Sequence, residues 1–468
     1  MSLFLTLCQQ TIGAKHVLSK QDEMQTYVSD WRQREVGKAL AILIPSNTEE
    51  VAALVKLCAE HQIGIVPQGG NTGLVLGSIP DQSGTCVVLS LRRLNRIRSV
   101  DTSNNTMTVE AGCLLAEVQG AAQQAGRLYP LSLASEGSCT IGGNLSTNAG
   151  GTAVLRYGNA RELCLGLEVV TATGEIWNGL RGLRKDNTGY DLRDLYIGAE
   201  GTLGIITAAV IKLFPIPKSE VTALVALADV NAALKLLSHV QDHTGASLTG
   251  FELFSDFCLH LVYKHFAELP KIFESSYPQY VLLELASAET QEHTYSQLEF
   301  ALEAALQSGL IIDVVIANSL SQSTSIWKMR ELISSAQARE GKNIKHDISL
   351  PVSQIGEFIS QTDALLQTAF PGCRMLSFGH LGDGNLHYNV SPPVDQLDSD
   401  FLLEQAAVNR IVHDSVHLHH GSISAEHGIG TLKKEELLVY KSPLEMRLMQ
   451  SIKTALDPHQ LMNPGKVI

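Results

Sequence analysis

Two histidines and a glutamate in the C-terminal third of the chain are residue types that bind a divalent metal. His380 and His387 flank the pair Asp383-Gly384, which favours a two-residue hairpin turn between short alternating apolar runs. Such a turn pairs the two histidines, and side chains that lie opposite each other share a face with Cβ atoms roughly 4.5–5.5 Å apart. Glu426 is the best third ligand downstream. Two imidazoles and one carboxylate leave a coordination position for water or substrate, as catalytic metal centres do.

These residues also allow other assignments. A polar hairpin with two stacked surface histidines would need no metal. His427 follows Glu426 directly, and an imidazole beside a ligand but free of the metal can act as a base, because it titrates near neutral pH. The reverse assignment, with His427 as the ligand and Glu426 as the base, stays open. The ligand set accepts manganese or cobalt as well as zinc.

Two glycine-rich stretches predict a site for a planar, anionic ligand. The first, residues 67–78, combines glycines with small polar residues, and consecutive free N–H groups in such a loop can bind a pyrophosphate. The second, residues 137–151, has almost no bulky side chain, so a ligand could lie against its backbone. A flexible turn and a disordered spacer are the alternatives. Because long loops held between ordered elements often carry function, we favour a cofactor site.

The elements that must position these residues alternate between strands and helices. A buried strand is predicted over residues 39–45, and a helix follows with Val51, Leu54, Val55 and Cys58 on one face. Prolines at positions 215 and 217 end regular structure. We therefore expect a first domain over residues 1–216, a second over residues 217–420, and a C-terminal segment over residues 421–468.

Composition narrows the class of protein. The chain has 468 residues, more than one hydrophobic core usually supports, with 44% hydrophobic and 18% charged residues. Its net charge of −13 argues against nucleic acid or an anionic membrane as a partner. The eight cysteines are scattered, and no apolar run approaches the length of a membrane span. These features predict a cytoplasmic protein with reduced thiols.

The chain resembles the flavin-binding vanillyl-alcohol-oxidase family, and within it the D-2-hydroxyglutarate dehydrogenases and the similar D-lactate dehydrogenases. The resemblance runs from about residue 39 to residue 468, and its marks are residues 67–78, 142–151, 184–190, 201–204, the hairpin at His380, 425–428 and 462–466. It implies an α+β protein: a two-lobed α/β FAD-binding domain, an inserted α+β substrate domain, and a C-terminal segment that returns to the FAD-binding domain.

The resemblance also implies how FAD is bound. The pyrophosphate would be held by Gly69, Gly70, Asn71, Thr72, Gly73, Gly77 and Ser78. The flavin would be lined by Ser138, Gly143, Asn144, Thr147 and Asn148, with Asn463 as a further contact. Asn71 stands about where covalent relatives carry the histidine that attaches to the flavin, so we expect non-covalent FAD.

Substrate-binding residues follow from the same resemblance. Arg330 and Ser334 are four residues apart on a predicted helix and so share a face. With Lys345, they are the expected receivers of the substrate's distal carboxylate, while Asn389 would orient the substrate. Two cations in an acidic protein suit a dicarboxylate, because each charge-assisted contact contributes about 1.5–3 kcal/mol.

The sequence therefore predicts an FAD-dependent dehydrogenase that uses zinc or another divalent metal. It would oxidise D-2-hydroxyglutarate, or a close D-2-hydroxy acid, by hydride transfer to the flavin, with His427 as the base. A D-lactate or glycolate dehydrogenase of the same family is one alternative, and a non-catalytic flavin-binding protein with a structural metal is another. An electron-transfer flavoprotein is the expected electron acceptor by resemblance. A homodimer is the working expectation for the assembly, which the residues do not fix.

Overall fold

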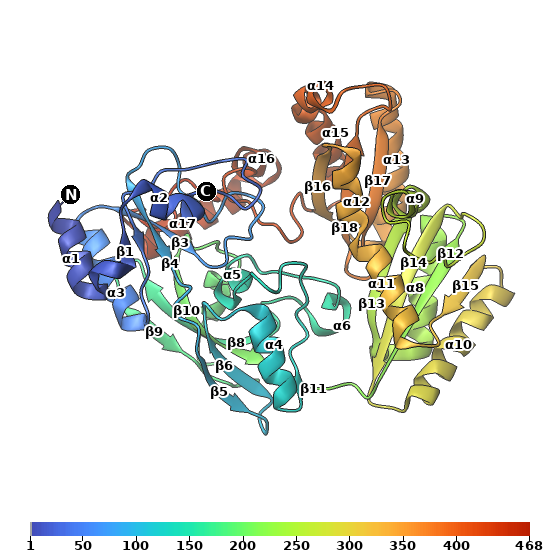
Figure 1. The fold of residues 1–468 in the computed structure, drawn as a ribbon, viewed down its shortest axis with the longest axis horizontal. Helices are drawn as coiled ribbons and strands as arrows, with labels where there is room; N and C mark the ends of the chain where they lie inside the picture. Colours follow the sequence, from blue (N-terminus) through green and yellow to red (C-terminus); the bar gives the residue numbers. More distant parts are fainter. Residues whose placement is uncertain (1) are drawn as a thin grey trace. The chain divides into compact units, whose positions relative to one another are not determined.

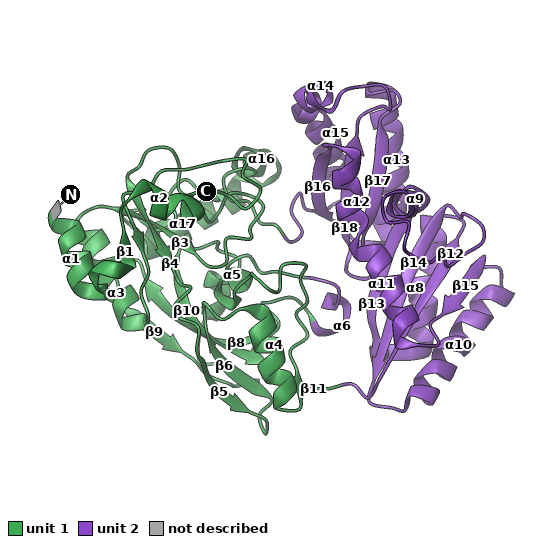
Figure 2. Ribbon diagram, viewed as in Figure 1, with its two compact units in different colours: residues 1–150, 158–216, 427–468 green, residues 151–157, 217–426 purple. Residues whose placement is uncertain are grey.

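The computed structural model describes residues 2–468 and divides the chain into two compact units (Figure 2). Unit 1 comprises residues 1–150, 158–216 and 427–468, and unit 2 comprises residues 151–157 and 217–426. The chain thus enters unit 2 twice before it returns to unit 1 at His427. The expected division had placed residues 421–426 in the C-terminal segment and residues 151–157 in the first domain, whereas the structure places both stretches in unit 2.

Unit 1 contains two main sheets (Figure 1). The first has the strand order β1-β2-β4-β3 and is parallel except for β1. The second has the order β5-β6-β10-β8-β9 and is antiparallel throughout. The strands are β1 (Val17–Leu18), β2 (Ile42–Leu43), β3 (Gly64–Gln68), β4 (Cys86–Ser90), β5 (Ile97–Asp101), β6 (Thr106–Glu110), β8 (Cys164–Thr171), β9 (Ile176–Gly179) and β10 (Gly204–Lys212), with a separate pair β7 (Arg127–Leu128) and β11 (Phe214–Pro215).

One hydrophobic core joins α1 and α3 to strands of both sheets of unit 1. The helix predicted from its apolar spacing is α3, whose predicted face, including Val51, Leu54 and Cys58, is buried. Burial of such a side chain contributes about 1.5–3 kcal/mol, so the apolar stripe fixes the helix on the sheet. The helices are α1 (Ser2–Ile12), α2 (Gln21–Val28), α3 (Thr48–Glu60), α4 (Leu115–Gln124), α5 (Ile141–Ser146), α7 (Arg193–Tyr196), α16 (Lys434–Tyr440) and α17 (Pro443–Leu456), with the 3-10 helix η1 (Ala14–His16).

The end of the chain returns to the first sheet of unit 1. The N–H of Ile65 in β3 donates to the carbonyl of Leu461 at 2.7 Å, and the N–H of Asn463 donates to the carbonyl of Ile65 at 2.7 Å. Met462, between them, is fully buried in the same core. The C-terminal segment is therefore a structural part of the unit that contains the glycine-rich stretches.

Unit 2 is built on a seven-stranded sheet of order β15-β12-β14-β13-β17-β18-β16, in which every neighbouring pair is antiparallel. One face of this sheet packs in a core with α9, α11 and α12. The strands are β12 (Ser219–Leu227), β13 (Leu248–Ser255), β14 (Gln279–Ser287), β15 (Asp313–Ile316), β16 (Ile344–Ser349), β17 (Arg374–His380) and β18 (Asn385–Ser391).

Helices of unit 2 pack on this sheet and on one another, as α8 does with α10 and α13 does with α15. They are α6 (Val154–Tyr157), α8 (Val230–Thr244), α9 (Asp256–His265), α10 (Gln291–Gln307), α11 (Leu320–Glu331), α12 (Ile333–Glu340), α13 (Ile355–Ala369), α14 (Asp398–Phe401) and α15 (Gln405–Leu418), with the 3-10 helices η2 (Gly245–Ser247), η3 (Val352–Gln354), η4 (Leu381–Asp383) and η5 (Leu402–Glu404). None of the helices in the described part of the chain is both long and apolar enough to cross a bilayer.

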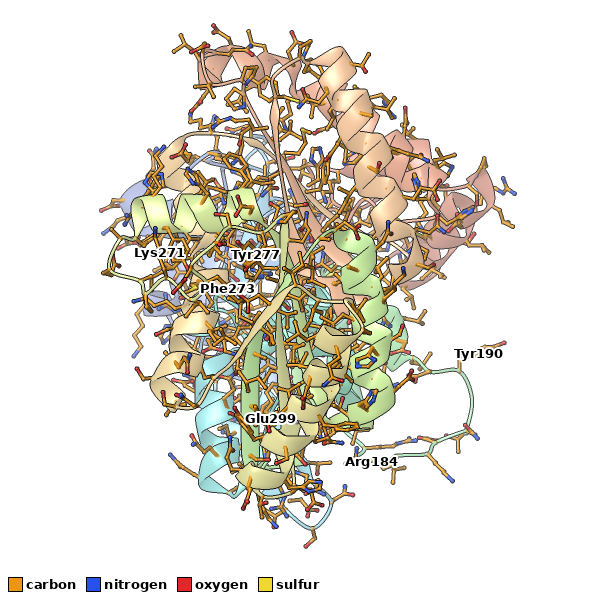
Figure 3. All side chains as sticks on the ribbon, turned by 90° about the vertical axis from the view of Figure 1, so that its right-hand side faces the viewer. Arg184, Tyr190, Lys271, Phe273, Tyr277 and Glu299 are labelled. Carbon is orange, nitrogen blue, oxygen red and sulfur yellow. The ribbon has the colours of Figure 1, made fainter. Side chains whose placement is uncertain are left out.

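Two sequence features stand out on the folded chain. The loop that contains residues 184–190, a mark of the family resemblance, projects from unit 1, with Tyr190 at its far end and 96% exposed (Figure 3). All eight cysteines are buried free thiols, as their scattered spacing predicts.

Candidate active site

Three side chains of unit 2 form a cluster that could hold a metal ion. His380 ends β17, His387 lies in β18, and Glu426 follows α15 in an irregular segment. One ligand atom from each residue lies within 4.8 Å of the others. The two imidazole rings are edge to face, with centroids 6.0 Å apart. The structure therefore brings together the three residues that the sequence singled out as ligands.

The hairpin that positions the two histidines differs from the predicted one. Residues Leu381–Asp383 form η4, and Gly384 alone of the Asp-Gly pair has a positive φ, 86°. His387 consequently pairs with Phe378, so the predicted pairing with His380 is wrong. Because the register moves by an even number of residues, and alternate residues of a strand point to the same side, both histidines still share one face.

Cross-strand pairing places further polar residues on that face. Asp347 in β16 lies opposite His387, and Glu252 in β13 lies opposite His380. Asn389 lies between Leu376 of β17 and Lys345 of β16. Directly opposed residues in a sheet share a face, so one surface of the sheet carries the candidate ligands together with carboxylates, a carboxamide and a lysine.

Glu252 connects the metal cluster to Arg330. Its side chain is completely buried; Oε1 accepts a hydrogen bond from Nδ1 of His380 at 2.5 Å, and Oε2 accepts one from Nε of Arg330 at 2.8 Å and lies 2.7 Å from Nη2. A carboxylate on Nδ1 leaves Nε2 of His380 for a metal, which is how histidine ligands are commonly oriented. Sequence analysis did not identify Glu252.

The electrostatics of this contact have a clear direction. Burial alone would raise the pKa of Glu252, but the charges of His380 and Arg330 outweigh it and lower that pKa to about 2. Burial alone would lower the pKa of His380, but the charge of the Glu252 carboxylate outweighs burial and raises that pKa to about 9. A metal ion that bound Nε2 would displace the proton held there.

Asp347 holds the other two candidate ligands. Its Oδ2 accepts a hydrogen bond from the N–H of Glu426 at 2.9 Å, and its Oδ1 accepts one from Asn385 at 2.9 Å and lies 3.7 Å from Nδ1 of His387. Burial raises the pKa of Glu426 to about 7, and the Asp347 charge adds to this effect while His380 opposes it. Buried carboxylates that resist ionisation are stabilised by a cation, so this donor set fits a divalent metal.

Arg330 and Ser334 lie in consecutive helices, α11 and α12. Leu332 lies between α11 and α12, but it keeps right-handed helical dihedrals, and its N–H donates to the carbonyl of Lys328 at 3.0 Å. Arg330 is buried, with its guanidinium carbon 4.9 Å from the ring centroid of Phe378, whereas Ser334 is exposed. That the two side chains act together stays a prediction.

The other two predicted substrate residues lie on neighbouring strands. Lys345 is exposed on β16, and Asn389 is buried on β18. Asn389 donates a hydrogen bond to Oε1 of Gln337, a buried residue of α12, at 2.9 Å. Nε2 of Gln337 is buried without a hydrogen-bond partner among residues 2–468. The sequence analysis did not single out Gln337, whose spacing carries no signal of its own.

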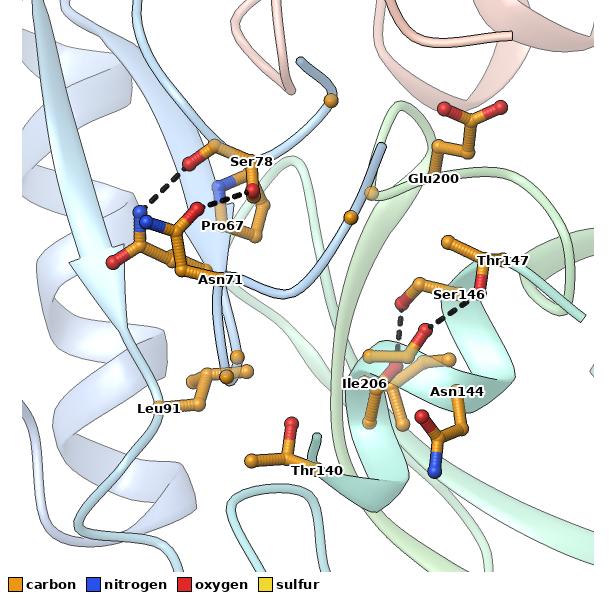
Figure 4. Close-up of a pocket in the computed structure, with 18 of the residues that line it drawn as sticks. Pro67, Asn71, Ser78, Leu91, Thr140, Asn144, Ser146, Thr147, Glu200 and Ile206 are labelled. Carbon is orange, nitrogen blue, oxygen red and sulfur yellow. Dashed lines mark hydrogen bonds between the residues drawn. The ribbon is translucent and has the colours of Figure 1, made fainter. Parts of the chain in front are cut away.

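A pocket of about 840 Å³, part of it open to solvent, lies in unit 1 where the two glycine-rich stretches meet (Figure 4). A Cβ atom on Gly69 would lie 2.3 Å from Oγ1 of Thr140, and one on Gly70 would lie 2.1 Å from the carbonyl oxygen of Ser138. Both distances are far below van der Waals contact. The close approach of the two stretches therefore requires glycine at these positions.

Most of the predicted FAD-binding residues line this pocket: Gly69, Gly70, Asn71, Thr72, Gly73, Gly77, Ser78, Gly143, Asn144 and Thr147. The other three do not line it. Ser138 presents its backbone oxygen to Gly70, and the side chain of Asn148 accepts a hydrogen bond from the N–H of Arg161 at 3.0 Å. Asn463 donates to the carbonyl oxygens of Gly77 and Glu200 at 2.9 and 2.7 Å, so it fastens the first loop in place.

Asn71 is held entirely by contacts within the protein. Its Oδ1 accepts a hydrogen bond from the hydroxyl of Ser78 at 2.8 Å (Figure 4). Its Nδ2 donates to the carbonyl of Ser29 at 2.9 Å. Thr140 differs, because its buried Oγ1 has no hydrogen-bond partner in the described chain. Buried polar atoms are nearly always paired, so a polar ligand such as FAD fits this pocket.

Glu200 and His427 also line the pocket; Glu200 was not predicted as a site residue, and His427 was predicted as the base rather than as an FAD-binding residue. The buried carboxylate of Glu200 accepts hydrogen bonds from the N–H groups of Ile429 and Gly430 at 2.7 and 2.8 Å. Burial raises the pKa of Glu200 despite these bonds. Glu200 thereby attaches the segment that begins at His427 to the pocket.

Comparison with known proteins identifies the family. The family model of an FAD binding domain matches residues 39–179, and that of the C-terminal domain of FAD linked oxidases matches residues 216–467, more than half of the chain. The chain belongs to the FAD-linked oxidase family. Within this family it is an FAD-dependent dehydrogenase that acts on a CH–OH group, and the alternative of a non-catalytic flavin-binding protein is set aside.

Three relatives of this FAD-linked oxidase match nearly all of this chain and are 36–38% identical to it. D-2-hydroxyglutarate dehydrogenase of Xanthomonas citri pv. viticola is 38% identical over 98% of this chain and 95% of its own. The mitochondrial D-2-hydroxyglutarate dehydrogenase of Arabidopsis thaliana is 38% identical over 98% of this chain and 80% of its own. The enzyme of that name from Stutzerimonas stutzeri is 36% identical over 96% of each chain. The resemblance noted in the sequence is confirmed.

Solved structures place the fold in the vanillyl-alcohol-oxidase type. p-Cresol methylhydroxylase superposes with a TM-score of 0.78 over 100% of this chain and 96% of its own, at 17% identity. An alkyldihydroxyacetonephosphate synthase gives 0.74 over 99% and 86%, at 16% identity. At such low identities, these superpositions are evidence for the fold alone. They confirm the predicted α+β class with its FAD-binding domain and inserted second domain.

Proposed function

We propose that this FAD-dependent dehydrogenase oxidises D-2-hydroxyglutarate, or a close D-2-hydroxy acid, to the 2-oxo acid with the help of a divalent metal. One observation carries the proposal: a single face of the unit 2 sheet bears His380, His387 and Lys345, with Glu426 and Arg330 beside them. A metal ligand set together with cations suits a substrate that has a hydroxy acid at one end and a carboxylate at the other. The names of the relatives support the same substrate.

Each residue has a proposed role. Bound FAD would supply the hydride acceptor, and a metal held by His380, His387 and Glu426 would acidify the 2-hydroxyl group. His427 takes the hydroxyl proton while the C2 hydrogen leaves with two electrons, so the alcohol carbon becomes a carbonyl. Glu426 and His427 are consecutive, which keeps the ligand and the base together along the chain.

The remaining residues bind and orient the substrate. Arg330, Ser334 and Lys345 receive the distal carboxylate, and Asn389 orients the end that reacts. Ten residues of the pocket hold non-covalent FAD, namely Gly69, Gly70, Asn71, Thr72, Gly73, Gly77, Ser78, Gly143, Asn144 and Thr147. Ser138 supports them through its backbone oxygen, and Asn148 and Asn463 do so through their side-chain amides.

A D-lactate or glycolate dehydrogenase is the second candidate, and one observation favours it. The charge of Arg330 is already matched by Glu252, which accepts a hydrogen bond from its Nε and lies 2.7 Å from its Nη2. A site with less net positive charge has less preference for a second carboxylate. Under this alternative the metal and His427 keep their roles and only the distal subsite changes.

A substrate panel decides between the two candidates. The purified holoenzyme is mixed anaerobically with D-2-hydroxyglutarate, D-malate, D-lactate or glycolate, and the loss of the oxidised flavin absorbance is followed. We expect the fastest bleaching with D-2-hydroxyglutarate. Bleaching by D-lactate without bleaching by D-2-hydroxyglutarate would reject the dicarboxylate assignment.

Several finer points stay predictions. We propose zinc or another divalent ion as the metal, an electron-transfer flavoprotein as the electron acceptor, and a homodimer in the cytoplasm as the working state. Metal analysis of the purified protein, reoxidation of the reduced enzyme by an electron-transfer flavoprotein, and its mass in solution test these points one by one.

A further inference from the structure

Glu252 lies between two groups to which the proposed function gives separate tasks. His380 would bind the metal next to the reacting carbon, and Arg330 would bind the carboxylate at the other end of the substrate. A single buried carboxylate contacts both residues, with Oε1 on His380 and Oε2 on Arg330. The two ends of the substrate site are thus joined through one side chain.

The contacts around Glu252 leave little freedom for either partner. Glu252 is fully buried and pairs with His380 across β13 and β17, so the backbone fixes this side of the link. On the other side, the guanidinium of Arg330 lies over the ring of Phe378 at 4.9 Å and meets Glu252 through Nε and Nη2. The two contacts engage one edge of the guanidinium, which leaves Nη1 as the nitrogen that Glu252 does not engage.

We propose that Glu252 is a positioning residue that sets the span between the metal site and Arg330, and thereby selects the chain length of the D-2-hydroxy dicarboxylate. The inference rests on the proposed function, because it needs both a metal at His380 and a distal carboxylate at Arg330. It adds a determinant of specificity that does not itself touch the substrate.

Asp347 provides the matched comparison. It contacts His387 and the N–H of Glu426, which are on the metal side, and it also accepts a hydrogen bond from Asn385. Arg330 is held on the other side by Glu252, whose Oε2 lies 2.8 Å from its Nε and 2.7 Å from its Nη2. Loss of the Asp347 charge should therefore weaken the metal site without changing the choice between long and short substrates.

The test compares Glu252→Gln, Glu252→Asp, Asp347→Asn and Leu282→Val with the wild-type holoenzyme. Leu282 lies opposite Glu252 in β14 and controls for a loss of packing. Zn²⁺ affinity is measured by competition with a chromophoric chelator. Specificity is the ratio of kcat/KM for D-2-hydroxyglutarate to that for D-lactate at saturating Zn²⁺, and D-malate and D-2-hydroxyadipate report chain length. Melting temperature and FAD content verify that each variant is folded.

We expect Glu252→Gln to weaken Zn²⁺ binding about 10- to 100-fold, the usual effect of losing the partner of a histidine ligand, and to lower the specificity ratio about tenfold or more. Glu252→Asp keeps the charge, so it should retain Zn²⁺ but change the rank order of the four-, five- and six-carbon substrates. Asp347→Asn should lose Zn²⁺ affinity and keep the ratio, and Leu282→Val should change neither.

The outcomes separate the inference from the function on which it rests. An unchanged ratio and rank order in both Glu252 variants, or an equal loss of the ratio in Asp347→Asn, would overturn the inference while the proposed function stands. If Glu252→Gln fails to fold, the rank order in Glu252→Asp decides. A wild-type enzyme that neither binds Zn²⁺ nor is reduced by D-2-hydroxyglutarate would remove the proposed function and the inference together.

Discussion

Replacement of Gly70 by alanine tests whether the two glycine-rich stretches must touch for the flavin pocket to form. The added Cβ would lie 2.1 Å from the carbonyl oxygen of Ser138 and 3.0 Å from Cα of Cys139. Ordinary van der Waals contact starts near 3.4 Å. The clash is with backbone, which cannot rotate away as a flexible side chain can, so the two stretches must separate by roughly 1 Å.

The expected cost follows from this geometry. Overpacking of a tightly packed site costs about 1–3 kcal/mol, and each 1.4 kcal/mol is a factor of ten in an equilibrium constant. If separation of the stretches occurs at the pocket that holds FAD, the affinity of Gly70→Ala for FAD should fall about 5- to 150-fold. If the structure resists separation, the same cost should appear as a lower melting temperature of the apoprotein.

The assay uses apoprotein titrated with FAD, with flavin fluorescence as the signal, together with thermal unfolding of the same samples. Gly120→Ala is the control, because Gly120 lies in α4 and a Cβ there meets no other heavy atom within 4 Å. The control should keep its FAD affinity and gain slightly in stability, since alanine replaces glycine in a helix. A Gly70→Ala protein with the FAD affinity and melting temperature of the control would refute the reasoning.

Three further predictions address the distal subsite, the ion pairs of unit 1 and the pocket wall. Lys345→Ala should lower kcat/KM for D-2-hydroxyglutarate about 10- to 150-fold and leave D-lactate nearly unaffected, because only the dicarboxylate loses a charge-assisted contact; steady-state kinetics with both substrates measure this, and an equal loss for both would contradict it. Burial opposes the ionisation of Glu168, but its hydrogen bonds from Arg98 and two threonines prevail and lower its pKa from the ordinary 4.5. A carboxylate with a lowered pKa stabilises the fold above about pH 4.5, and this stabilisation is lost as the pH falls through the pKa of the folded state. In urea unfolding, Glu168→Gln should therefore be less stable than wild type at pH 7, and the difference in unfolding free energy should narrow below pH 4.5. A difference independent of pH would count against this ion pair. Glu200→Ala should lower the unfolding free energy of unit 1 by about 1–3 kcal/mol for each N–H group left unpaired. Limited proteolysis should then cleave the chain after residue 426 faster than in wild type, and cleavage at the wild-type rate would exclude the anchoring role.

The sequence predicted which residues come together in the candidate metal site better than it predicted how the hairpin arranges them. The residue types of His380, His387 and Glu426 and their relation to a hairpin were enough to group them. They were not enough to predict the strand register. The Asp-Gly pair was expected to form a two-residue turn, whereas the chain forms η4 there. The shared face survived the error because the shift is even.

Glu252 and Asp347 show what sequence reasoning could not reach. Glu252 is 128 residues from His380 along the chain, and only the strand order of the sheet brings them together. A signal was present, since a glutamate in the apolar run Phe251 to Phe254 must find a buried partner. Which partner it finds depends on long-range pairing, which local patterns do not encode.

The boundary between α11 and α12 at Leu332 shows a different limit. A helix that ends and restarts within two residues keeps its apolar periodicity, so nothing in the spacing separates Arg330 from Ser334. The glycine-rich stretches were easier to recognise as a possible binding site, because an unusual composition over a dozen residues has few structural explanations. Residues that contribute single contacts, such as Thr140, become visible only once the pocket is built.

The central claim is that a metal at His380, His387 and Glu426 activates the alcohol that FAD oxidises. The most direct measurement is the rate of flavin reduction by D-2-hydroxyglutarate in a stopped-flow experiment, first on holoenzyme freed of metal by a chelator with FAD retained, and then after addition of Zn²⁺. Loss of a Lewis acid worth about 3 kcal/mol predicts a rate lower by about 100-fold, restored by Zn²⁺ in the wild type and not in Glu426→Gln. An undiminished rate in the metal-free holoenzyme would contradict the claim.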